Sequence, residues 1–256
     1  MQKVTKAIII LTLSYIALTT YAFGVFLQQP IVQGEVLTVQ AVIEPIFYVV
    51  AMVVGNFLIF KAVYSQEKTK KRFFDEKKLL LPAIVLLMLV AFGAGIHATG
   101  QLIEETFVNT GTATQHYTDN FSSKVSYFLE EYPGHFLVVL PALILSYFLA
   151  KIELNRKLPL LKSYERFVIF GCAIFFGAIS AIGNAEGHST VLMLPLGLYL
   201  LFKLYQHNKS LQRNLLTMPY SSFFAVSIVI MAVLNIIFGV SYGWFTQPTE
   251  LGFGSV

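Results

Sequence analysis

Seven apolar stretches, each close to the length that crosses a lipid bilayer, constrain this chain more than any other feature. A helix of about 20 residues spans the hydrocarbon core. The stretches cover roughly residues 7–27, 41–64, 79–99, 133–150, 167–183, 189–205 and 220–242. Hydrophobic residues make up 56% of the 256 positions and charged residues only 12%, which is more apolar surface than one soluble core can hide. The sequence therefore predicts an all-α integral membrane protein, a bundle of seven transmembrane helices that forms a single domain over residues 1–256.

The basic residues predict the orientation, because short loops rich in Lys and Arg stay in the cytoplasm. With seven spans, 17 of the 18 Lys and Arg residues fall on the side of the N-terminus, and Lys124 falls on the other. That side also has 5 of the 14 acidic residues, so its net charge is 17 minus 5, or +12, and that of the opposite side is 1 minus 9, or −8. We expect a protein of the cell or cytoplasmic membrane, with its N-terminus in the cytoplasm and its C-terminus outside.

The basic side is the ordinary orientation signal, and it attracts anionic lipid headgroups. Membrane lipid is therefore the expected partner, and nucleic acid is not. On the same side, His207 is expected to lie in a solvated loop with Gln206 and Asn208.

A histidine closes the third apolar stretch in the sequence GAGIHATGQLIEE. His97, Gln101 and Glu104 are spaced by four and three residues, so they share one face of a helix, with Glu105 beside them. The neighbouring glycines allow another helix to approach closely. We expect this polar face at the outer end of the third span and in a helical extension into the outer loop, residues 101–132.

Two later segments place a histidine and a glutamate at the ends of other spans. EEYPGH contains Glu131 and His135, and NAEGH contains Glu186 and His188. Pro133 suits a first helical turn, which puts Glu131 at or before the helix cap and His135 just inside the helix. The predicted topology brings both segments to the outer side, where His97 also lies.

Histidine and glutamate together suggest a metal site near the outer face. Glu44 joins the group because an ionised residue near the end of an apolar span costs several kcal/mol unless it is paired or bound. Imidazole and carboxylate are typical ligands of zinc, iron or manganese. The only cysteine, Cys172, excludes a disulfide framework and a cysteine metal site. The predicted ligands of a divalent ion, zinc or alternatively iron, are His97, His135, His188, Glu44, Glu104 and Glu105.

Several functions fit such a site. One is metal-dependent hydrolysis of a lipid or small apolar substrate, with Glu131 or Glu186 as the catalytic base. A di-iron oxidoreductase is an alternative, since paired irons share bridging glutamates. The third is a non-catalytic integral subunit that assembles with other membrane subunits, or an ion-binding transport protein. No compact signature such as HExxH is present, so the sequence leaves open whether the protein is an enzyme.

Overall fold

The structure is a computed structural model that describes residues 2–22, 53–65, 77–108, 124–125, 128–156, 161–212, 214–246 and 251, with the backbone alone at 17–22, 77–79, 101–108 and 130–131. These residues contain seven α-helices: α1 (Lys3–Ala22), α3 (Gly55–Tyr64), α4 (Lys77–Val108), α6 (His135–Glu153), α7 (Ser163–Glu186), α8 (Thr190–Ser210) and α9 (Pro219–Tyr242). A π-helical turn, η3 (Glu130–Gly134), precedes α6, and a 3₁₀ turn, η4 (Leu215–Thr217), precedes α9. The described residues contain no β-strand.

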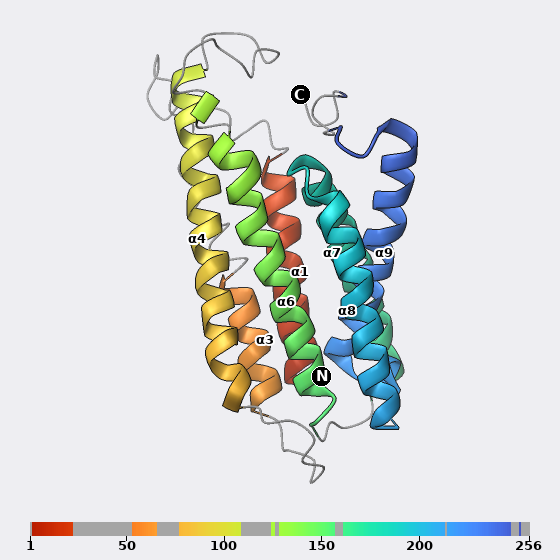
Figure 1. Ribbon diagram of the computed structural model, residues 1–256. Coiled ribbons are helices and arrows are strands. Elements are labelled where there is room, and N and C mark those ends of the chain that lie inside the picture. The colour runs from red at the N-terminus through yellow and green to blue at the C-terminus, as the bar shows by residue number, and fades with distance from the viewer. Residues whose placement is uncertain are drawn as a thin grey trace.

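The helices lie side by side along one common direction (Figure 1). α7 and α9 make the most extensive contact, followed by α4 with α6. The start of α1 and the end of α9 lie at opposite ends of the bundle. The starts of α6 and α8 share one end, so these two helices run in the same direction.

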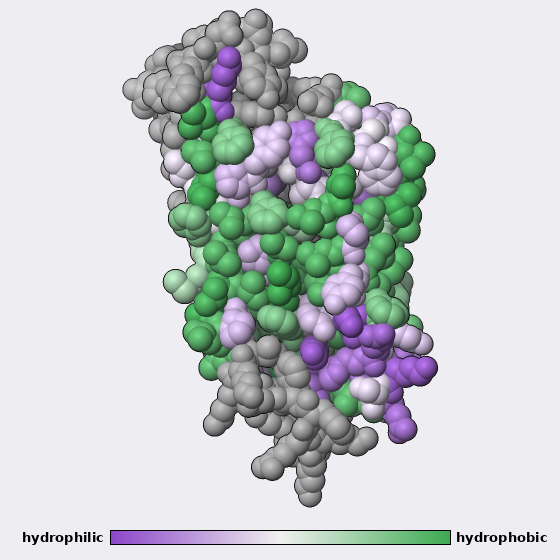
Figure 2. Space-filling model, in the orientation of Figure 1, coloured by the Kyte–Doolittle hydropathy of each residue, from purple (hydrophilic) through white to green (hydrophobic). Residues whose placement is uncertain are grey.

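Four of the described helical segments are long and apolar enough to cross a membrane: Leu80–Gly100, Tyr132–Glu153, Ser163–Glu186 and Pro219–Tyr242. On the face shown in Figure 2, apolar residues form a broad band around the middle of the bundle, and hydrophilic residues gather toward its ends. An all-helical fold is therefore confirmed for the described residues, and four of its helical segments have the length and composition of membrane spans. The count of seven spans and the orientation stay predictions.

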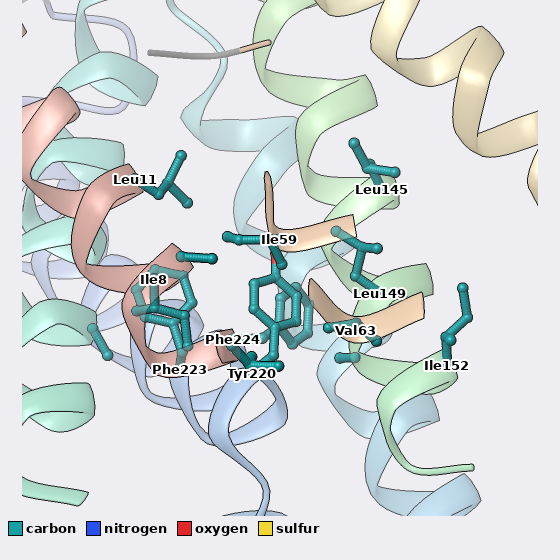
Figure 3. Packing of buried hydrophobic residues seen from close by; sticks show 14 of the residues in the cluster. Ile8, Leu11, Ile59, Val63, Leu145, Leu149, Ile152, Tyr220, Phe223 and Phe224 are labelled. Atoms are coloured by element: carbon teal, nitrogen blue, oxygen red, sulfur yellow. The ribbon is translucent and has the colours of Figure 1, made fainter. Parts of the chain in front are cut away.

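Buried aliphatic and aromatic side chains from α1, α3, α6 and α9 form the core in the half of the bundle away from the start of α6. Ile8 and Leu11 of α1 face Ile59 of α3, and Leu145 and Leu149 of α6 complete the layer (Figure 3). All five are at most 1% exposed. This packing fixes α6, whose first residue is His135.

Glu153, the last residue of α6, joins that helix to the start of α9. Its carboxylate accepts hydrogen bonds from the backbone N–H groups of Tyr220 (2.8 Å) and Ser221 (2.7 Å) and from the Ser221 hydroxyl (2.8 Å). The first N–H groups of a helix have no partner within the helix, and the positive end of the helix dipole favours a negative charge. The fully buried carboxylate therefore caps α9 from another helix.

A second buried carboxylate, Glu165, holds the start of α1 against α7. Its Oε1 accepts a hydrogen bond from the backbone N–H of Gln2 (2.7 Å), and its Oε2 accepts one from that of Lys162 (3.3 Å). Both buried acids thus occupy the end of the bundle opposite the start of α6.

Two local predictions need comment. α4 continues as far as Val108, so the helical extension of the third span is confirmed. The prediction of a solvated loop at His207 is wrong, because α8 continues to Ser210 and Asn208 is buried. The reason is the helical period: Leu204 and Asn208 are four residues apart and both face the bundle.

Candidate functional site

The three histidines selected from the sequence lie at one end of the bundle. His97 is on α4, three residues before the end of the apolar segment Leu80–Gly100. His135 is the first residue of α6, three residues after the apolar segment Tyr132–Glu153 begins. His188 lies in the short turn between α7 and α8. Each histidine is therefore close to the end of an apolar segment.

His97 and His135 are in direct contact. Their ring centroids are 4.5 Å apart, and the ring planes meet at 68°. Gly134 allows this approach, since a Cβ atom there would lie only 3.1 Å from both Cα and Cβ of His97. Gly93 has the same role one helical turn earlier on α4, where a Cβ atom would lie 2.6 Å from the backbone carbon of Leu137. The prediction that glycines permit close helix packing is confirmed at Gly93. At Gly95, an added Cβ atom would have no neighbour within 4 Å.

The turn between α7 and α8 packs against His135. A Cβ atom on Gly187 would lie 2.5 Å from both Cβ and Cγ of His135, a distance that real Cβ atoms do not reach. Only glycine therefore fits between the end of α7 and this imidazole. The contact places His188, the next residue, beside the pair formed by His97 and His135.

His188 has a left-handed backbone, with φ at 48°. Its N–H donates to the carbonyl of Ala185 (3.3 Å), and the N–H of Ser189 donates to that of Asn184 (2.9 Å). These two bonds form the Schellman motif that ends many helices, in which the left-handed position is usually glycine. A histidine there costs about 1 kcal/mol of backbone energy relative to glycine.

Tyr132 completes the group and was not selected from the sequence. Its ring stacks on that of His188, with centroids 5.6 Å apart and planes 14° apart. The ring of Phe128 in turn stacks on that of Tyr132, with the centroids 5.5 Å apart. Both aromatic side chains are about half exposed, as is usual at a membrane boundary. The aromatic residue within the motif EEYPGH was the signal that could have identified Tyr132.

His188 follows Gly187, which packs on His135, and the ring of His135 contacts that of His97. The three histidines therefore lie close together at this end of the bundle.

The carboxylates expected around the histidines are placed less completely. Glu186 is the last residue of α7, half buried and two positions before His188. Glu104 and Glu105 lie on α4, where a rise of about 1.5 Å per residue puts Glu104 about 10 Å beyond His97 along the helix. The backbone of Glu131 is in η3, and its side chain and all of Glu44 lie outside the described residues.

The expected start of α6 is wrong in one respect. Gly134 already has helical φ and ψ, so no cap separates Glu131 from His135, and a π-helical turn runs directly into α6. Pro133 explains the wider turn, since its ring would clash with the carbonyl four residues earlier in a regular helix. Such π-helical turns occur frequently at functional sites.

Within the part of the chain that the structure describes, no three His, Cys, Asp or Glu side chains are arranged as a metal-binding group. The spacing of the first two rings is nevertheless suitable. Two imidazoles that bind one tetrahedral zinc through nitrogen at about 2 Å have centroids about 5 Å apart, and His97 and His135 are at 4.5 Å.

Comparisons with protein families, with curated proteins and with solved structures give no significant match.

Proposed function

We propose that this chain is a seven-span membrane protein that binds a divalent metal ion through His97, His135 and His188 near the outer membrane surface. The convergence of these three residues, from α4, α6 and the turn between α7 and α8, is the observation that carries the proposal. The packing of Gly187 on His135 supports the proposal, because it brings the turn that carries His188 against the start of α6.

The seven-span topology is supported by two independent features. Each apolar stretch of the sequence contains an α-helix among the described residues. The distribution of Lys and Arg, 17 on one side and one on the other, supports a cytoplasmic N-terminus. With that orientation the histidine group faces the outside.

Neutral imidazoles are good zinc ligands, and three of them leave a fourth position for water or substrate. We propose metal-assisted hydrolysis of a lipid or small apolar substrate as the reaction. His97, His135 and His188 would hold the zinc ion, which would supply a water that loses its proton near neutral pH. Glu186 is half buried and two residues from His188, which is suitable for moving a proton between that water and the substrate. Glu131 is the other candidate for this base, since it precedes His135 by four residues.

Elemental analysis of the purified protein tests the proposal. We expect about one zinc per chain, as in three-histidine catalytic sites, and its loss in a variant with alanine at positions 97, 135 and 188. The matched control is His207→Ala, which removes a histidine at the other end of the bundle and should keep the metal. A measurement of about two irons per chain would indicate di-iron oxidation instead of hydrolysis. If wild-type protein reconstituted with zinc, iron or manganese contained no metal, both the hydrolysis and the oxidation proposals would be overturned. The proposal of a non-catalytic subunit would then stand.

A further inference from the structure

A second polar surface lies at the opposite end of the bundle, on α6 and α8. Tyr147 and Lys151 are four residues apart on α6, and Tyr199, Lys203 and His207 repeat that spacing on α8. Residues four apart share one face of a helix. Since α6 and α8 run in the same direction and contact each other, the two Tyr and Lys pairs lie at the same end of the bundle.

Contacts join the two pairs into one surface. The Lys151 ammonium lies 5.8 Å from the centre of the Tyr147 ring, and the Lys203 ammonium lies 5.6 Å from that of Tyr199. The helices that carry the two pairs contact each other and run in the same direction. The two ammonium groups and the two phenols therefore lie on neighbouring helices at one end of the bundle, and they are here called the α6–α8 basic surface.

The surroundings of Lys203 are those of a helix side in contact with lipid. Tyr199, Phe202 and Tyr205 are each 54% exposed, and Lys203 is half buried among them. Hydrophilic residues gather near the lower end of α8 in Figure 2, directly below the apolar band. A cation in that position meets the headgroups of the membrane rather than bulk water.

Ordinary orientation lysines extend away from the apolar region toward water. Each of the two lysines on the α6–α8 basic surface instead lies over a tyrosine one helical turn closer to the middle of the bundle. Their ammonium groups therefore stay beside the apolar band of the bundle, where we expect the lipid phosphates.

We propose that the α6–α8 basic surface is a binding site for the phosphate of an anionic phospholipid. Lys151 and Lys203 provide the charge, the hydroxyl groups of Tyr147 and Tyr199 are hydrogen-bond donors, and the exposed aromatic side chains beside Lys203 contact the acyl chains. This site is independent of the histidine group and of the metal proposed there.

Lipid binding to the detergent-solubilised full chain tests this site, by native mass spectrometry with phosphatidylglycerol and with phosphatidylcholine. We expect tighter binding of phosphatidylglycerol, and about a fivefold loss in each of Lys151→Gln and Lys203→Gln, the factor that corresponds to one lysine near an anionic surface. Lys203→Arg should keep the preference. The matched control is Lys209→Gln, an exposed lysine at the end of the same helix, which should lose little.

Three outcomes would overturn the proposal. Equal binding of the two lipids would exclude an anionic headgroup site. An equal loss in Lys209→Gln and Lys203→Gln would show general charge attraction instead of a site. Displacement of phosphatidylglycerol by millimolar inorganic phosphate would identify a soluble phosphate as the ligand. Circular dichroism of each variant shows that the helices are retained.

Discussion

The rings of His97, on α4, and His135, at the start of α6, meet edge to face with their centroids 4.5 Å apart. Gly134 allows the two histidines to approach each other. Gly187 allows the turn between α7 and α8 to pack on His135. The histidine group is thus specified by backbone packing as well as by side-chain chemistry. Substitutions of glycine should therefore disturb it as strongly as substitutions of histidine.

Gly187→Ala should destabilise the protein. The added Cβ atom would lie 2.5 Å from Cβ and Cγ of His135, and forcing atoms into a packed region costs about 1–3 kcal/mol. The measurement is thermal unfolding of the purified protein in detergent. Gly183→Ala is the matched control, since it lies on the same helix with nothing within 4 Å of the added atom and should be neutral or slightly stabilising. Equal stability of the two variants would show that the turn does not pack on His135.

His188→Gly should be more stable than His188→Ala by about 1 kcal/mol, because glycine removes the cost of the left-handed backbone at φ 48°. Both variants lose the stacking with Tyr132, so their difference isolates the backbone. Chemical unfolding measures it. Both should also lose bound metal, which would explain why histidine occupies a glycine position. Full metal content in His188→Gly would remove His188 from the ligand set.

Some of this arrangement follows from the sequence for a simple physical reason. The apolar stretches predict where the spans end, although α4 itself continues to Val108. Histidines that close such stretches are therefore expected at one level, set by the bilayer thickness. The short connection after Glu186 likewise requires adjacent helices. The left-handed conformation of His188 and the stacking of Tyr132 could not be predicted in this way, since they depend on contacts between distant segments.

The contacts of the carboxylates likewise could not be predicted from the sequence. Glu153 was one acidic residue among five on its side of the chain, and only the packing of α6 against α9 reveals its role at Tyr220 and Ser221. Spacing on a helix predicts a shared face for His97 and Glu104 but not their separation of about 10 Å along the axis. Metal ligands contributed by the glutamates stay predictions.

Cysteine labelling should confirm the orientation. With Cys172 replaced by Ala, Lys124→Cys should react with a membrane-impermeant reagent from outside intact cells, and Lys209→Cys should react only after the membrane is opened. Both positions are exposed in the structure. Labelling in the reverse order would place the histidine group in the cytoplasm and overturn the proposed topology.

Glu153→Gln should lower the stability by about 2–3 kcal/mol without affecting metal content. The carboxylate accepts three hydrogen bonds at the start of α9, two from backbone N–H groups and one from a hydroxyl, and bonds to a charged acceptor in a buried site are among the stronger ones. Glutamine keeps the size of the side chain but turns an N–H group toward one of these donors and removes the charge that favours the helix N-terminus. Ser221→Ala, which removes only the hydroxyl, should cost about 1 kcal/mol. Thermal unfolding ranks the two variants, and metal analysis reports on the other end of the bundle. A loss of metal in Glu153→Gln while the helices remain folded would show that the two ends are coupled, contrary to the separate roles proposed here.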